Sequence, residues 1–169
     1  MSEPQAGRDA AAADAIDPAT LTPDALAAEV ARRMWAEDRA SQALGMELLE
    51  VRAGYARIRM PVRRDMTNGH GICHGGYMFL LADSTFAFAC NSHNQRAVAA
   101  GAEIHFVASA HEGDVLTAEG LELHLAGRSG VYDMRVTDQD GRLVALFRGR
   151  SATIKGRFVE TPDAGVAKE

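Results

Sequence analysis

The residues best suited to chemistry lie in one stretch: His74-Gly75-Gly76 and, eight positions after Gly75, Asp83. The glycines open a predicted helix, where backbone N–H groups lack partners within the helix and the helix dipole is positive. Because glycine has no side chain, a ligand atom can approach these N–H groups, as an oxyanion hole requires. Asp83 lies among apolar residues, and burial would raise its pKa, as suits a general base or a nucleophile. Together these groups would polarise a carbonyl and activate an attack on it.

Each part also has a simpler structural explanation. The two glycines alone are better explained by a tight entry into a buried helix. A lone buried aspartate is equally well explained as an inert side chain that hydrogen-bonds Ser84, Thr85 or a nearby backbone group. The sequence therefore leaves both explanations of Asp83 open.

The spacing of Gly75 and Asp83 has a consequence for assembly. Along a helix, eight positions correspond to about 12 Å. A hydrogen-bond donor and a base must both come within about 3 Å, or one water molecule, of a single reacting carbon. One chain cannot meet this requirement with these two groups, whereas two chains with antiparallel central helices can, each lending Gly75 to the other's Asp83. If both residues are catalytic, the spacing predicts at least a homodimer.

The elements before this stretch are a tail and a helix. Residues 1–20 are rich in Ala, Asp and Pro without an apolar period, and they are expected to be disordered. A helix is predicted over residues 21–40, because Thr22 suits the N-cap and Pro23 the first helical position. It is expected to dock on the domain through an apolar stripe of Leu26, Val30, Met34 and Trp35.

Residues 41–157 are predicted to form one α+β domain. A buried helix over about residues 75–91 follows two strand-like segments and precedes four more, with short turns such as Asp140-Gly141 between them. Short turns imply antiparallel pairing, so a curved antiparallel sheet should wrap around the central helix. Residues 158–169 are expected to form a C-terminal tail. The strands are predicted over residues 46–51, 55–60, 97–108, 114–125, 130–138 and 142–154.

Composition excludes several classes of protein. The 169 residues fit one domain, and the net charge of −5 argues against a nucleic-acid-binding protein, which would carry a basic stripe. Cys73 and Cys90 do not form a disulfide framework, and reduced thiols in a cytoplasmic setting are the natural interpretation. The first residues lack the apolar core of a secretory signal, and no apolar run reaches the length of about 18 that a membrane span needs.

Several motifs around the central helix match one known family. They are Asn68-Gly69-His70, Cys73-His74-Gly75-Gly76, Leu81-Ala82-Asp83, Ala89-Cys90-Asn91-Ser92, Gly130-Val131-Tyr132-Asp133 and Ala145-Leu146-Phe147-Arg148-Gly149. On these motifs the chain resembles the PaaI-type family, the hotdog-fold thioesterases of phenylacetic acid degradation. The resemblance covers about residues 40–156, so the N-terminal 40 residues lie outside it.

The resemblance implies a hotdog fold and hydrolysis of aryl-acetyl-CoA thioesters, preferentially ring-hydroxylated ones, to the free acid and CoA. It implies no separate cofactor, because CoA is part of the substrate. Carried over by position, Asp83 would be the nucleophile or the general base, and the Gly75 N–H would polarise the thioester carbonyl. His74 would support the oxyanion turn, and Asn68 would orient the carbonyl or the lytic water. The family is usually a dimer of dimers, which implies a homotetramer.

The chain departs from this pattern on the strand after the helix. Some relatives hold the lytic water there with a Ser or Thr, whereas Val98-Ala99-Ala100-Gly101 carries no hydroxyl. Asn68, Ser84 or Thr85 would then hold the water, or Asp83 acts alone, and the choice between nucleophile and general base stays open. The candidates for substrate binding around the helix are therefore Gly76, Ser84 and Thr85.

Further substrate contacts are predicted from charge and aromatic character. CoA carries phosphates, and the candidates to bind them are Arg128 in a glycine-flanked turn and, near the last strand, Arg148 and Arg150. Each is also explained, and better, as a solvated arginine of a strand or turn. Three phenylalanines of the helix could line an aryl pocket, but core packing is the simpler explanation for at least two of them. These are Phe79, Phe86 and Phe88.

The same residues also fit a metal site and two other functions. His70, Cys73 and His74 are metal-ligand types, but zinc sites usually need four ligands and no second cluster has suitable spacing, so no metal is predicted. A hotdog hydratase or dehydratase would pair a histidine, conceivably His70, with Asp83. A non-catalytic acyl-CoA-binding module would keep the pocket and tolerate Asp83→Asn.

Overall fold

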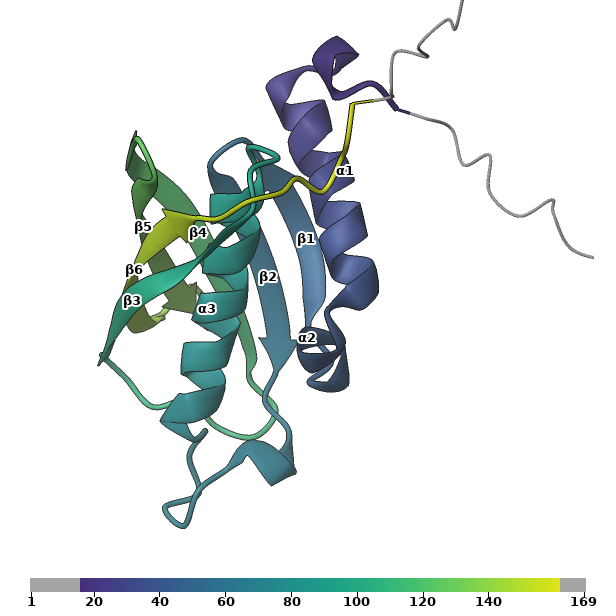
Figure 1. Ribbon diagram of the computed structural model, residues 1–169. Helices are drawn as coiled ribbons and strands as arrows, with labels where there is room; N and C mark the ends of the chain where they lie inside the picture. The colour runs from purple at the N-terminus through teal and green to yellow at the C-terminus, as the bar shows by residue number, and fades with distance from the viewer. Residues whose placement is uncertain (1–15, 162–169) are drawn as a thin grey trace, which may run out of the picture.

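The computed structural model describes residues 16–161, which form a six-stranded antiparallel sheet around a long helix (Figure 1). The strands are β1 (Glu47–Arg52), β2 (Tyr55–Pro61), β3 (Ala97–Phe106), β4 (Val115–Ala126), β5 (Ser129–Thr137) and β6 (Leu143–Thr153). The helices are α1 (Pro23–Glu37), α2 (Arg39–Ala43) and α3 (Gly75–Asn91), with the 3-10 helices η1 (Pro18–Thr20) and η2 (Arg64–Met66). The predicted α+β arrangement and the order of its elements are confirmed.

The sheet has the strand order β1-β2-β4-β5-β6-β3, so β1 and β3 are its edges. In β2, Ala56, Ile58 and Met60 are fully buried, while the alternating Arg57 and Arg59 lie on the other face, as expected of a half-buried strand. β3 pairs with β6 alone among the described strands. The outer edge of β3 is therefore available for pairing with another chain.

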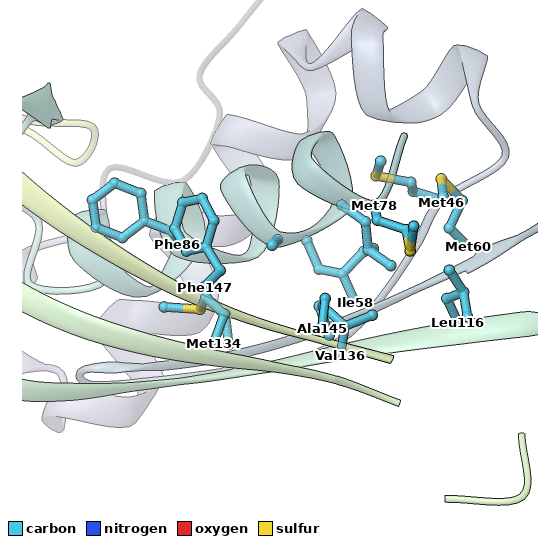
Figure 2. Packing of buried hydrophobic residues seen from close by; sticks show 14 of the residues in the cluster. Met46, Ile58, Met60, Met78, Phe86, Leu116, Met134, Val136, Ala145 and Phe147 are labelled. Atoms are coloured by element: carbon cyan, nitrogen blue, oxygen red, sulfur yellow. The ribbon is translucent and has the colours of Figure 1, made fainter. Parts of the chain in front are cut away.

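The hydrophobic core lies between α3 and the concave face of the sheet (Figure 2). Phe86 of α3 packs against Tyr132 and Phe147, with ring centroids 5.4 and 6.0 Å away. A Cβ at Gly149 would come within 2.8 Å of the Phe86 ring, so this glycine of β6 lets the helix approach the sheet closely. The all-apolar character of α3 thus follows from burial on most of its sides.

The N-terminal helix begins where the sequence predicts. The Thr22 side chain accepts a hydrogen bond from the Ala25 N–H, and Pro23 occupies the first turn. The predicted single helix is wrong at its end, because Asp38 breaks it into α1 and α2 and caps α2 through the Ser41 N–H. Of the predicted stripe, Val30 is buried, and Met34 and Trp35 pack against the core.

At both ends of the described part, residues 16–161, the structure extends beyond the limits predicted from the sequence. Asp17 caps η1 and Pro18 is buried, so residues 16–20 do not belong to a disordered tail; residues 1–15 lie outside the described part. Val159, in the predicted C-terminal tail, is fully buried, and the Asn94 side chain bonds both its N–H and its carbonyl. The domain therefore extends past residue 157; residues 162–169 lie outside the description.

Candidate active site

The first turn of α3 offers one free backbone donor. His74 is the N-cap, and its Nδ1 accepts the Gly76 N–H at 3.0 Å, while the His74 carbonyl accepts the Tyr77 N–H at 3.0 Å. The Gly75 N–H has no acceptor among residues 16–161. The predicted roles thus separate, because His74 fixes the turn, Gly76 is used to hold it, and Gly75 alone presents an N–H to a ligand.

A phenylalanine that the sequence did not single out lies against this turn. A Cβ at Gly75 would come within 2.8 Å of the Phe106 Cζ, so glycine lets this ring lie close to the turn, and an added side chain would have to displace it. Phe106 ends β3, and 52% of the residue is exposed. Its ring therefore lies against Gly75, the residue that carries the free N–H, and remains partly exposed.

Asp83 is a half-buried carboxylate on α3, two helical turns beyond Gly75. It forms no hydrogen bond or ion pair within the described part of the chain, and burial raises the pKa of its carboxyl group. A charged group in this state is costly for stability. The raised pKa and the free lone pairs are those of a base or nucleophile that is ready to react.

The two hydroxyls next to Asp83 are directed elsewhere. Ser84 is 8% exposed and lies 2.9 Å from the Ser41 Oγ, which donates to Asp38 Oδ2 at 2.7 Å. Thr85 is fully buried and donates to the Leu81 carbonyl at 2.8 Å. Neither hydroxyl bonds Asp83, so the explanation of Asp83 as an inert residue satisfied by them finds no support. Their own bonds within the chain indicate structural roles rather than substrate contacts.

Asn68 lies in an exposed loop that projects beyond the N-terminal end of α3 (Figure 1). Its Oδ1 accepts the His70 N–H at 2.9 Å, and its backbone bonds Ile72 and Gly71, which closes the loop. The Asn68 side-chain amide donates no hydrogen bond to any described residue. Asn68 therefore keeps donors for a ligand, at the same end of the helix as Gly75.

Two of the candidate arginines, Arg148 and Arg128, differ in their surroundings. Arg148 forms a bidentate ion pair with Asp133, at 2.6 and 2.7 Å, so its charge is neutralised within the sheet. Arg128 donates from Nε and Nη2 to the Thr153 carbonyl and has no carboxylate partner in residues 16–161. Only Arg128 of the two retains an uncompensated charge for a phosphate.

The three phenylalanines of α3 are mainly core residues. Phe86 and Phe88 are each 1% exposed, and Phe88 packs against Trp35 of α1. Phe79 is partly buried, with its ring edge-on to Phe147. The core explanation is therefore confirmed for Phe86 and Phe88.

Two further properties concern metals and membranes. Among the described residues, no group of three or more His, Cys, Asp or Glu side chains is placed to hold a metal ion. No described helix combines the length and the apolar character that crossing a membrane requires. His70, Cys73 and His74 are accordingly close in sequence without forming a ligand set.

Known proteins share this fold and these motifs. The family model of the thioesterase superfamily matches residues 70–145. The acyl-coenzyme A thioesterase PaaI of Escherichia coli is 42% identical over 126 residues, which are 75% of this chain and 90% of that protein. The structure of the E. coli PaaI protein from the phenylacetic acid degradation operon superposes with a TM-score of 0.79 and 40% identity, over 80% of this chain and 99% of that one.

A more distant structure is that of a protein of Streptococcus pneumoniae described as a hypothetical thioesterase, solved with coenzyme A. It has a TM-score of 0.64 and 27% identity, and the match covers 66% of this chain and 90% of that chain. The fold, the matched region and the identity to the E. coli protein agree with one another. The chain therefore belongs to the PaaI-type family of hotdog-fold acyl-CoA thioesterases.

Proposed function

We propose that this thioesterase hydrolyses aryl-acetyl-CoA thioesters, preferentially ring-hydroxylated ones, to the free acid and CoA. The observation that carries the site assignment is the pair of unsatisfied groups on α3, the Gly75 N–H and the Asp83 carboxylate. The choice of acyl group is supported by the name of the E. coli relative, which comes from the phenylacetic acid degradation operon.

The chemistry follows from these two groups. The Gly75 N–H donates to the thioester carbonyl oxygen and stabilises the negative charge that develops on it, aided by the positive end of the α3 dipole. Asp83 either takes a proton from the attacking water or attacks the carbonyl carbon itself, after which water hydrolyses the acyl-enzyme anhydride. In both routes the C–S bond breaks, CoA leaves as a thiolate that takes up a proton, and the acyl group leaves as a carboxylate. Asn68 is the remaining candidate for orienting the water, because Ser84 and Thr85 bond other groups.

The site is proposed to form between two chains. α3 is one continuous helix, so Gly75 and Asp83 of the same chain stay about 12 Å apart. The edge strand β3 has no second neighbour among the described strands, and Val98 on it is 47% exposed. Antiparallel pairing of β3 with its copy would place the two α3 helices side by side and bring Asp83 of one chain to Gly75 of the other. A homotetramer, as a dimer of these dimers, is proposed on the family resemblance.

Subunit mixing tests the shared site. Gly75→Pro removes the N–H at the first helical position, where proline is tolerated, and His74 before it already has an extended backbone. We expect Gly75→Pro and Asp83→Asn each to lower kcat by at least about 10²-fold. A dimer with one copy of each variant keeps one intact site, so random mixing should restore about a quarter of the wild-type rate for a two-fold dimer.

The readout is thiol release from phenylacetyl-CoA, its ring-hydroxylated forms and acetyl-CoA. Gly75→Ala is the matched control, because it keeps the N–H but places the same Cβ against Phe106. Failure of the mixture to regain activity would show that Gly75 and Asp83 do not act together across two chains. No thiol release from any of these substrates by the unmodified protein would overturn the proposed function, and with it favour a non-catalytic acyl-CoA-binding role.

A hydratase would need a histidine at the carboxylate. No imidazole bonds Asp83 within the described residues. The exposed His70 lies in the loop before the N-terminal end of α3, whereas Asp83 lies in the middle of this helix. Both cysteines, Cys73 and Cys90, are free. We propose, as from the sequence, that the enzyme acts in the reducing cytoplasm, where thiols stay reduced.

A further inference from the structure

The free edge of β3 presents its backbone groups in a fixed order (Figure 1). The Val107 N–H, just past the end of β3, donates to the Val144 carbonyl of β6 at 2.8 Å. In an antiparallel ladder, successive residues direct their N–H and C=O alternately toward a neighbouring strand and away from it. The residues that direct these groups away from β6 are therefore Ala102, Ile104 and Phe106, which we call the edge-directed residues.

Only the second half of β3 is regular enough to pair with another strand. A β-bulge between Ala99 and Gly101 interrupts the first half, whereas the register with β6 is continuous from Gly101 to Phe106. Natural sheets often protect such an edge with Lys or Pro, and β3 contains neither. The segment Gly101–Phe106 is therefore open to pairing.

The two titratable side chains of β3, Glu103 and His105, lie on this segment. Both are exposed, on the face opposite that of Ile104, which packs against the core. Arg148 of β6 lies opposite Glu103 but is already bound by Asp133. Neither Glu103 nor His105 belongs to an ion pair within the described part of the chain. Each is therefore available to a group of another chain.

We propose that two chains pair through β3 in the antiparallel register centred on Ile104, with Glu103 of each chain bonded to His105 of the other. This inference rests on the proposed two-chain site and names the side chains that align it. A neutral or a protonated imidazole can donate a ring N–H to the carboxylate, and two-fold symmetry makes the pair occur twice. The pair lies at a non-hydrogen-bonded position of the ladder, where facing side chains are closest.

Neighbouring registers leave these side chains without a partner. The edge-directed residues can face only one another, which restricts where the two-fold axis can lie. An axis at Glu103 would set two like charges directly opposite each other, which destabilises a sheet. An axis at His105 would set the two imidazoles opposite each other and leave Glu103 facing the apolar Val107.

The register centred on Ala102 needs a separate argument. It would bring Glu103 opposite Gly101 of the other chain, beside Arg150, whose Nη2 would lie 2.9 Å from a Cβ at Gly101. However, this register would set the regular end of each segment against the bulge of the other chain. The register centred on Ile104 leaves the bulge outside the paired residues.

Disulfide formation between two single-cysteine variants tests the register. Glu103→Cys and His105→Cys are co-expressed, oxidised mildly and separated on a non-reducing gel. Directly opposite cysteines are within reach of a disulfide, so the pair of variants should yield a covalent dimer, from up to about half of the chains if they pair at random. Each variant expressed alone should yield none. Cys73 and Cys90 are buried, and the unmodified protein serves as their control.

The other outcomes each reject this register. A covalent dimer from Glu103→Cys alone would put the axis at that residue, and one from His105→Cys alone would put it there instead. No covalent dimer from the co-expressed pair would show that these positions do not face each other.

An exchange of charges tests the pair itself. His105→Glu sets two carboxylates against each other, and Glu103→Lys removes the acceptor. In a mixed dimer of the two variants, one pair is Glu with Lys and the other is Glu with His. Mixed dimers, counted by native mass spectrometry after co-expression, should therefore exceed the half, roughly, that random pairing gives. A random share would reject the pair.

Two matched co-expressions serve as controls. His105→Glu with the unmodified chain should give about half mixed dimers, because the mixed dimer keeps one favourable and one unfavourable pair. Glu103→Lys with Arg150→Glu should also give about half, since Arg150 lies outside the proposed pair. An excess of mixed dimers in this second control would favour the axis at Ala102 and overturn the proposal.

Neither measurement depends on hydrolysis, so the two proposals fail separately. Covalent dimers from the co-expressed cysteine variants, without thiol release by the unmodified protein, would support the register and reject the proposed function. Thiol release without these covalent dimers would support the function and reject the register.

Discussion

Asp138, in the turn between β5 and β6, and Asp83, in the middle of α3, are both shielded from water but differ in their hydrogen bonds. Asp138 is 6% exposed and accepts the N–H groups of Asp140 and Arg142 and the Arg142 guanidinium, at 2.8 to 3.1 Å. Burial alone would raise the pKa of Asp138, but these bonds outweigh burial and lower it. Asp83 has no such partner, and burial raises its pKa.

The comparison shows how a hydrogen-bonded carboxylate differs from the one that we propose to be reactive in this fold. The Asp138 turn supplies the donors to its own carboxylate, because Asp140 and Arg142 follow two and four positions later in sequence. In the middle of a helix the nearby N–H groups are used by the helix itself. The hydroxyls beside Asp83, on Ser84 and Thr85, bond other groups. The hydroxyls next to Asp83 thus have hydrogen-bond partners, whereas the Asp83 carboxylate has none. An unpaired carboxylate lowers the stability of the fold and suits a reactive group.

The largest expected effect is on catalysis. Asp83→Asn should lower kcat/KM for phenylacetyl-CoA by about 10²–10⁴-fold, because the amide can neither accept a proton nor form the acyl-enzyme. The same substitution at Asp138 should leave kcat/KM nearly unchanged, since the hydrogen bonds of the Asp138 carboxylate are to Asp140 and Arg142 and none is to Gly75 or Asp83. Thiol release by the two variants at neutral pH measures the difference. Comparable losses in both would mean that the charge at Asp83 acts on stability rather than on chemistry.

The pH dependence of kcat/KM should report the raised pKa of Asp83. Only the ionised carboxylate can act, so the rate should fall about tenfold per pH unit below this pKa. The midpoint of this acid limb should lie above 3.8, the ordinary value of an aspartate, because burial disfavours the charged form. A profile of kcat/KM between about pH 3 and pH 8 locates this midpoint, because that range includes the ordinary pKa of an aspartate and values well above it. A midpoint at or below 3.8 would mean that a partner stabilises the charged form in the assembled enzyme.

The sequence predicted those parts of the fold and site that depend on local signals. α3 spans Gly75–Asn91, the predicted range, because its capping residue and its apolar run are contiguous in sequence. The Asp140-Gly141 hairpin joins β5 to β6 as predicted, with Gly141 at φ 79°. The division of roles between Gly75 and Gly76 needed the structure, because it depends on the ring orientation of His74.

The parts that were not predicted depend on contacts between distant segments. Ser84 was a candidate for substrate binding, but it meets Ser41, 43 residues earlier, across α2 and α3. Phe106 looked like one more strand residue, and only the fold brings it to Gly75. From the sequence alone, Arg148 and Arg128 were equally good candidates for a phosphate contact. Only the pairing of β5 with β6 shows that Arg148 lies opposite Asp133. No periodicity or motif carries such information.

The smallest expected effect is on stability, and it should have opposite signs at the two aspartates. Asp138→Asn should lower the thermal unfolding midpoint at neutral pH, because it weakens bonds to the Arg142 guanidinium and to two N–H groups. Asp83→Asn should leave the midpoint unchanged or raise it, because it removes an unpaired, half-buried charge.

The pH dependence of unfolding fixes these signs. The pKa of Asp138 is lowered on folding, so its stabilisation is present above its unfolded pKa and is lost as the pH falls through its folded pKa. The pKa of Asp83 is raised, so the stability linked to its protonation is full below its unfolded pKa and is lost as the pH rises through its folded pKa. The loss of stability in Asp138→Asn, relative to the wild type, should therefore disappear in acid. Any increase in stability of Asp83→Asn should appear only as the pH rises above about 4. If Asp83→Asn were instead less stable than the wild type at neutral pH, Asp83 would have a stabilising partner, which the subunit interface would then have to supply.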